Sequence, residues 1–256
     1  MRRWLPEILA LPLLPWLLAQ GKRTRRITPR MPEASGERHG LCLPQQSVSE
    51  VWAPFSVLAI GESPVAGVGV DTQTQAITAQ LAQRLATQWR CPISWSAFGK
   101  NGATVSDAIR DVGPHLPDMQ INVVLIAFGV NDSTAFRSSK RYRQDLASLV
   151  QLVRQRLRPD LLVIAGVPPL HLFPALPQPL RHVLGLKAST LNAAAKSLAS
   201  AMPQTIFVPI QSNARDRSLM AMDGYHPSAS GVLLWAEQLA AAIDGNVNED
   251  RRFSSR

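Results

Sequence analysis

The chain has 256 residues, of which 46% are hydrophobic and 18% charged, so it is expected to be globular with one substantial core rather than disordered or fibrous. Residues 1–40 hold eight Lys or Arg and three Asp or Glu and carry +5 of the formal charge of +9, leaving +4 for the much longer remainder. A nearly balanced domain with a basic N-terminal arm argues against a nucleic-acid-binding protein and favours an anionic membrane surface as the partner of that arm.

The N-terminal segment, residues 1–27, combines an apolar run with a basic cluster. Residues 4–19 are strongly apolar, but the run is shorter than the roughly 20 residues that span a bilayer, and it contains Glu7 and three prolines. A simple transmembrane helix is therefore not expected. We favour an anchor that lies in the membrane interface, with its tryptophans at the headgroups and its basic cluster on anionic lipid. An export signal and an element packed on the domain itself are the alternatives.

The expected location is the cytoplasmic face of the membrane or the cytoplasm, with export by an N-terminal signal as the alternative. Positive charge directly after an apolar segment opposes export of the chain beyond that segment. The two cysteines, Cys42 and Cys91, are too few for a disulfide framework, which favours a compartment that keeps thiols reduced.

The remainder divides into a linker, a domain and a tail. Residues 28–51 are interpreted as a linker because they are rich in Pro and Gly and lack periodicity, and residues 244–256 as a polar tail. Between them, over 52–243, strand-like apolar runs alternate with stretches of helical spacing. Strands are expected over 55–60, 93–98, 121–128, 161–167 and 206–210, and helices over 72–89, 105–112, 141–157, 180–202 and 229–243. Such alternation requires crossover connections and predicts an α/β domain with a parallel sheet covered on both faces.

Four polar turns stand where such a sheet would hold a ligand, because the ligand site of a parallel sheet gathers at the carboxyl ends of its strands. The turns are Gly61-Glu62-Ser63, residues 99–104, Gly129-Val130-Asn131-Asp132 and, ahead of the last helix, Asp223-Gly224-Tyr225-His226. Each turn alone is a weak signal, since short motifs match by chance. Their order along successive strands is the stronger observation, and together they hold every part of an acyl-transfer site.

Three of these residues are candidates for a catalytic triad. Ser63 is the candidate nucleophile, which is weak until a base takes its proton. His226 is the candidate base, returning that proton to the leaving alcohol. Asp223, three residues before the histidine, is close enough in a turn to accept from its second ring nitrogen and fix its tautomer.

An ester carbonyl attacked by Ser63 also needs hydrogen-bond donors for the negative charge that develops on its oxygen. The candidates are the backbone N–H of Ser63, the backbone N–H of Gly102, which permits close approach, and the side-chain amide of Asn131. This chemistry requires no metal or organic cofactor.

The sequence resembles the SGNH hydrolase superfamily, the GDSL-type esterases, lipases and lysophospholipases. Ile60-Gly61-Glu62-Ser63 matches the nucleophile block, Asn101 to Thr104 the glycine block, Gly129 to Asp132 the Gly-x-Asn-Asp block, and Asp223 to His226 the Asp-x-x-His block. The resemblance covers roughly residues 52–243 and implies a flavodoxin-like three-layer α/β/α fold with a five-stranded parallel sheet. It departs from the family pattern at Glu62, where aspartate is usual.

The leading hypothesis is a serine hydrolase that cleaves carboxylic esters of small molecules or lipids through an acyl-enzyme intermediate. The loop after the fourth predicted strand, with His171, Leu172 and Phe173, is expected to overhang the site and form apolar walls for an acyl chain. The alternatives are an acyltransferase, a carbohydrate deacetylase, or a membrane-tethered binding module that has lost catalysis.

Overall fold

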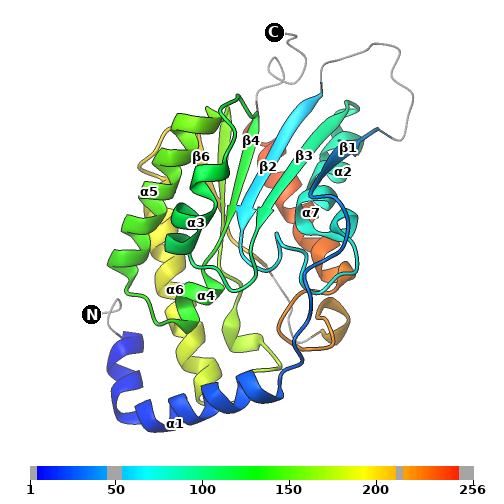
Figure 1. Ribbon diagram of the computed structural model, residues 1–256. Helices are drawn as coiled ribbons and strands as arrows, with labels where there is room; N and C mark the ends of the chain where they lie inside the picture. The colour runs from blue at the N-terminus through cyan, green and yellow to red at the C-terminus, as the bar shows by residue number, and fades with distance from the viewer. Residues whose placement is uncertain (1–4, 45–53, 212–215, 248–256) are drawn as a thin grey trace.

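A computed structural model describes residues 5–44, 54–211 and 216–247 (Figure 1). Its centre is a six-stranded sheet in the order β1-β3-β2-β4-β5-β6, in which β2 to β6 are parallel and β1 is antiparallel to β3. The strands are β1 (His39–Cys42), β2 (Phe55–Gly61), β3 (Ile93–Gly99), β4 (Val123–Ala127), β5 (Leu161–Ala165) and β6 (Thr205–Val208). The expected parallel sheet is confirmed, with one antiparallel edge strand in addition.

Helices cover both faces of this sheet and make the expected three layers (Figure 1). In β2, Val57 and Ala59 pack into the core on one face of the sheet, whereas Leu58 and Ile60 pack into the core on the other face. A strand buried on both faces has no polar side, which is why its sequence is a continuous apolar run. The helices are α1 (Leu5–Ile27), α2 (Ile77–Trp89), α3 (Val105–Asp111), α4 (Val130–Thr134), α5 (Ser139–Leu157), α6 (Leu180–Ala199) and α7 (Ala229–Asp244), and the 3-10 turns are η2 (Gln73–Gln75), η3 (Gly113–His115), η4 (Leu170–Leu172) and η5 (Arg217–Leu219).

The described part of the segment expected to be a linker is instead built into the domain. Residues 28–38, here called the strap, run from α1 to β1, and Ser35 forms a bridge with Thr72 on the way. In β1 only Cys42 is buried, so this edge strand lacks the apolar alternation that marks a strand in sequence. Residues 45–53 lie outside the described ranges.

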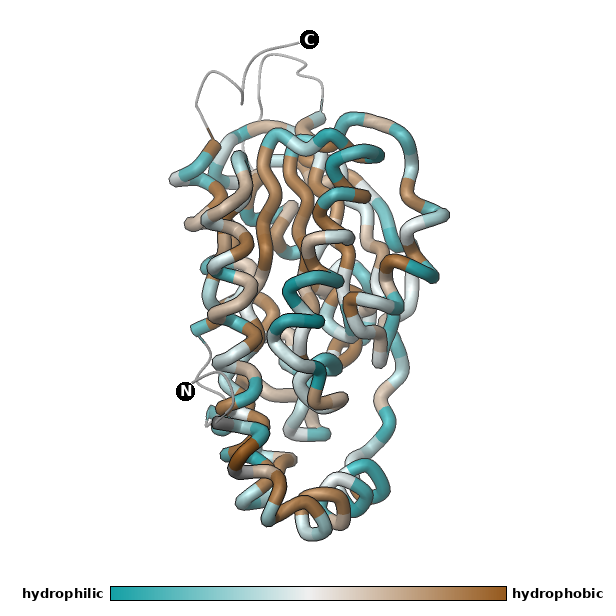
Figure 2. Tube along the Cα trace, turned by 90° about the vertical axis from the view of Figure 1, so that its left-hand side faces the viewer, coloured by the Kyte–Doolittle hydropathy of each residue, from teal (hydrophilic) through white to brown (hydrophobic). Residues whose placement is uncertain are grey.

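The N-terminal segment forms α1, a helix packed by one face on α6. Ala10 and Leu17 are buried against Val183, and Glu7 pairs with Lys187, whose side chain is completely buried, at 2.5 Å. In Figure 1, α1 lies across the end of the molecule toward which β2 and β3 point, and Figure 2 shows apolar residues recurring along it. Within the described ranges, no helix has both the length and the hydropathy needed to cross a membrane.

Candidate active site

The ends of three adjacent strands bring the predicted turns together. Gly61 at the end of β2 is in register with Gly99 of β3 and with Ala127 of β4. A Cβ on Gly61 would lie 2.3 Å from a Val65 methyl and 2.8 Å from the carbonyl of Ala127, and one on Gly99 would lie 2.2 Å from the backbone nitrogen of Ala66. The chain can therefore fold back tightly after β2 only because both positions are glycine.

Ser63 stands at the start of this tight turn. Its carbonyl accepts from the backbone N–H of Val68 at 2.9 Å, and the carbonyl of Glu62 accepts from the N–H groups of Val65 and Ala66 further along the turn. Ser63 is buried, with 7% of its surface exposed, and it lines an apolar pocket together with His226. The backbone of the candidate nucleophile is thus held by the turn itself.

The turn from Asp223 to His226 has the geometry of an oriented base. Nδ1 of His226 lies 2.5 Å from Oδ2 of Asp223, while Oδ1 of Asp223 accepts from the backbone N–H of Tyr225 at 2.9 Å and of His226 at 3.0 Å. Gly224 has φ +62°, which lets the turn close. Burial acts to raise the pKa of Asp223, but the hydrogen bonds from His226 and Tyr225 outweigh it and hold that pKa below its ordinary value. A carboxylate that stays ionised at neutral pH is what an orienting acid requires.

Glu62 is buried and bridges two of the predicted blocks. Its Oε1 accepts from the backbone N–H of Val130 at 2.9 Å, and its Oε2 accepts from the backbone N–H and the side-chain Nδ2 of Asn131 at 2.9 and 2.6 Å. Burial raises the pKa of Glu62 to about 8, although these N–H donors act in the opposite direction. The carboxyl group of Glu62 therefore contacts the loop that holds a candidate oxyanion donor.

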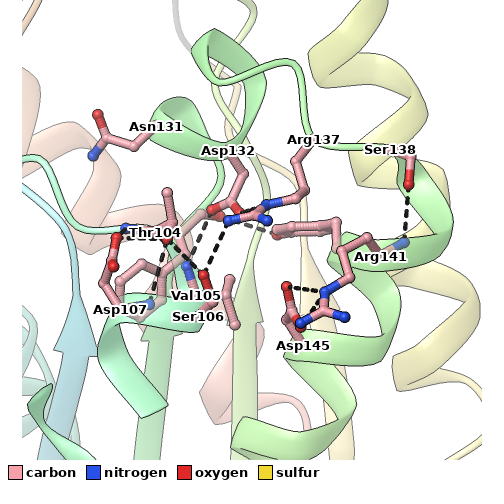
Figure 3. Close-up of polar contacts among 12 residues, drawn as sticks. Thr104, Val105, Ser106, Asp107, Asn131, Asp132, Arg137, Ser138, Arg141 and Asp145 are labelled. Atoms are coloured by element: carbon pink, nitrogen blue, oxygen red, sulfur yellow. Dashed lines mark hydrogen bonds and ion pairs between the residues drawn. The ribbon is translucent and has the colours of Figure 1, made fainter. Parts of the chain in front are cut away.

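The neighbouring Asn131 and Asp132 point in different directions (Figure 3). Nδ2 of Asn131 contacts the carbonyl oxygen of Ala103 at 3.1 Å in addition to Glu62. Asp132 is completely buried, accepts from the backbone N–H of Val105 at 3.2 Å and lies 3.9 Å from Nε of Arg137. Burial raises the pKa of Asp132 to about 6. Asp132 therefore ties the Gly-x-Asn-Asp loop to the start of α3, whereas the amide of Asn131 is turned toward Glu62 and Ala103 and does not line the pocket.

Gly102, the third candidate oxyanion donor, sits in an exposed turn after β3. It has φ +78°, and no atom lies within 4 Å of where its Cβ would stand. The turn is tied to the nucleophile strand by the backbone N–H of Lys100, which donates to the carbonyl of Gly61 at 3.1 Å. A glycine is needed here for its backbone conformation and not for lack of room.

Of the three residues predicted to bind substrate, Phe173 is the one that lines the pocket. Phe173 lines the pocket and stacks edge-on with Tyr225 at 5.4 Å, whereas His171 is exposed and Leu172 packs against the core. The pocket is also lined by Met220, which follows η5, and by Leu234 and Trp235 of α7. These three residues are not predicted from the sequence, because the two in α7 follow the ordinary apolar spacing of a core helix and no motif marks Met220.

Comparison with known sequences places this geometry in a family context. Residues 59–233 match the GDSL-like lipase/acylhydrolase family. A GDSL-like esterase of Mycobacterium tuberculosis, Rv1075c, is 28% identical over 249 residues, which covers 91% of this chain and 77% of that protein.

Solved structures share the fold. The crystal structure of TesA superposes with a TM-score of 0.61 at 20% identity, covering 75% of this chain and 99% of TesA. The lipase Lip_vut3 from a goat rumen metagenome gives a TM-score of 0.59 at 18% identity, covering 73% of this chain and 97% of the lipase.

Proposed function

The chain belongs to the GDSL-like lipase/acylhydrolase family, and on that premise we propose that it cleaves carboxylic esters through an acyl-enzyme intermediate on Ser63. The observation that carries the proposal is the 2.5 Å contact between His226 and Asp223 at the same pocket that Ser63 lines. Ser63 and His226 line one pocket and Asp223 contacts His226, which supports a triad; a binding module without catalysis would not need this arrangement.

The reaction follows the roles of these side chains. Asp223 accepts the Nδ1 proton of His226, so that Nε2 is left as the base that takes the Ser63 hydroxyl proton while Oγ attacks the ester carbonyl. The tetrahedral intermediate expels the alcohol, which receives the proton from Nε2. Water then attacks the acyl-enzyme by the same route and releases the acid.

The oxyanion of this intermediate is assigned to the N–H groups of Ser63 and Gly102 and to the amide of Asn131. Nδ2 of Asn131 is engaged by Glu62 at 2.6 Å and by the Ala103 carbonyl at 3.1 Å. An amide nitrogen has only two hydrogens, so an oxyanion would replace the longer of these contacts, and Glu62 would keep the amide oriented.

The pocket favours esters with an apolar acyl group. Its walls include Phe128, Phe173, Met220, Leu234 and Trp235, which suit a hydrocarbon chain. A carbohydrate deacetylase releases only an acetyl group and has no use for such walls, so we propose lipid-like or other long-chain esters as substrates.

The test of the proposed function is ester turnover with covalent labelling. The purified protein should hydrolyse p-nitrophenyl esters, with kcat/KM rising from acetyl to longer acyl chains because each buried methylene contributes about 0.8 kcal/mol, or about fourfold. A fluorophosphonate should abolish turnover with one label per chain, on the peptide that contains Ser63. A protein that neither hydrolyses any ester of the series nor reacts with the fluorophosphonate would be the inactive binding module.

We also propose that α1 docks on an anionic membrane surface such as the cytoplasmic leaflet. One face of α1 is committed to α6, which leaves Leu11, Leu14 and Trp16 exposed at 72%, 46% and 63% on the same helix. Arg25 and Arg26 follow in its last turn, also exposed. Exposed aliphatic and aromatic side chains followed by basic residues match the layered chemistry of an anionic bilayer surface.

This face lies at the end of the molecule that carries the site. In Figure 1, α1 lies across the end of the molecule toward which β2 and β3 point, and Ser63 follows the end of β2. Docking through α1 would thus bring the pocket close to the lipid layer that supplies its substrate.

Vesicle binding tests the docking proposal. Arg25→Gln with Arg26→Gln should weaken sedimentation with phosphatidylglycerol-containing vesicles by about 2 kcal/mol, or about 30-fold, because each basic residue contributes about 1 kcal/mol at an anionic surface. Leu11→Gln should also weaken binding, and Leu233→Gln, a matched change at an exposed leucine of α7, should not. The proposal would be contradicted if all variants bound the anionic vesicles equally well. It would also be contradicted if the wild type bound neutral phosphatidylcholine vesicles as strongly as anionic ones.

A further inference from the structure

We infer that Glu33 and Arg38 of the strap are positioning residues for the turn that presents Gly102 to the oxyanion. This inference rests on the proposed esterase function. Oε1 of Glu33 accepts from the backbone N–H of Asn101 at 2.7 Å, and Oε2 accepts from Nη2 of Arg38 at 2.5 Å. The other guanidinium nitrogen, Nη1, donates to the carbonyl of Gly99 at 2.6 Å. One carboxylate and one guanidinium thus hold both ends of the stretch that leads to Gly102.

This turn needs an external support because of its own composition. Gly102 is exposed and has open space on its outer side, and a glycine restrains its own backbone less than any other residue. The N–H of Asn101, which Glu33 binds, precedes the N–H of Gly102 by one residue, so fixing the first peptide plane limits the direction of the second. An oxyanion donor must be held to within a fraction of an ångström to be effective.

The strap is itself held firmly enough to act as that support. The N–H of Ala34 donates to the carbonyl of Ala66 at 3.2 Å, and the carbonyl of Ser35 accepts from Gln73 at 2.8 Å. The carbonyl of Arg38 accepts from Ala97 of β3 at 2.7 Å. Glu33 is therefore flanked by backbone hydrogen bonds on one side, and Arg38 leads directly into β1.

The two residues lie outside the stretch that matches the family, residues 59–233. The strap, which precedes the matched stretch, thus supports a loop that lies within that stretch and contains Gly102. Its contribution is to alignment of the transition state and not to substrate binding, since neither Glu33 nor Arg38 lines the pocket.

Steady-state kinetics on a soluble short-chain p-nitrophenyl ester test the inference. Glu33→Ala and Arg38→Met should each lower kcat by about 10-fold or more with KM changed less than about twofold, because loss of one oxyanion donor costs about 100-fold or more and these changes only loosen one. Glu33→Gln, which keeps an acceptor for Asn101, should retain more activity than Glu33→Ala. The melting temperature is measured for each variant, since a positioning role leaves the fold intact.

The matched control is Glu37→Ala, a glutamate of the same strap whose side chain is 84% exposed, and its kcat should equal that of the wild type. A wild-type kcat in Glu33→Ala would overturn the inference. So would a decrease in kcat that Glu37→Ala shows equally, or one that disappears when the assay is run well below the melting temperature. These outcomes differ from failure of the esterase proposal, in which the wild-type protein itself would be inactive.

Discussion

Ser63→Ala should lower kcat for a p-nitrophenyl ester at least about 1,000-fold while the melting temperature stays within about 2 °C of the wild type. The change removes only the hydroxyl, and the turn that holds residue 63 is built from backbone hydrogen bonds that alanine keeps. Residual turnover reflects the oxyanion donors and binding, which act without the nucleophile. The measurement is kcat by stopped or continuous assay, together with fluorophosphonate labelling, which should vanish.

A second serine serves as the control for an effect of serine-to-alanine substitution that is unrelated to the site. Ser148 lies on the exposed side of α5 with its hydroxyl bonded to the carbonyl of Gln144, and Ser148→Ala should keep wild-type kcat. Normal turnover by Ser63→Ala would refute the assignment of the nucleophile, whatever the other variants do.

Assayed above pH 8, where the Glu62 carboxyl group is ionised, Glu62→Gln should lower kcat by about 100-fold, close to the cost of losing one oxyanion donor. Two carboxyl oxygens accept from three N–H groups of the Gly-x-Asn-Asp loop. An amide would turn an NH2 group toward these donors, displacing Asn131. Glu62→Asp keeps both acceptors and should lose less. The control is Glu237→Gln on α7, whose carboxylate pairs with Arg84, and it should not change kcat.

The same residue predicts a pH dependence of stability. Burial raises the pKa of Glu62 from 4.5 to about 8, so between these values the folded protein binds one proton more than the unfolded chain. Its contribution to the free energy of unfolding is fully present below pH 4.5 and is lost as the pH rises through about 8. Glutamine does not titrate, so Glu62→Gln does not lose this contribution as the pH rises. In denaturant unfolding, the free energy of unfolding of Glu62→Gln should therefore rise relative to that of the wild type between about pH 5 and about pH 8. A constant difference across this range would contradict the assigned pKa.

The alternation of apolar runs and helical spacing was sufficient to predict the order of strands β2 to β6 along the chain and the edge at which the site lies. Continuous apolar runs such as 121–128 are unambiguous because both faces of the sheet are buried, and side chains after their ends must converge. The roles of Ser63, Asp223 and His226 were predicted from the chemistry of their residue types.

Other features depend on contacts between segments far apart in sequence. Three of the four β1 residues are not buried, so no periodicity marked that strand. Trp235 follows the spacing of any core helix, and only the packing of α7 makes it a pocket wall. The hydrogen-bond partner of Glu62, Asn131, lies 69 residues further along the chain, and the sequence Gly-Glu-Ser does not predict this contact.

The edge strand β1 also determines which strand edge of the sheet is exposed to other copies of the chain. A polypeptide beginning at residue 52, where the domain expected from sequence starts, would lack β1 and would leave the outer backbone groups of β3 unpaired. An exposed strand edge is a template for pairing with another chain, and a long edge is a better template than a short one. The residues His39–Cys42 thus replace the seven-residue edge that β3 would present with an edge of four residues.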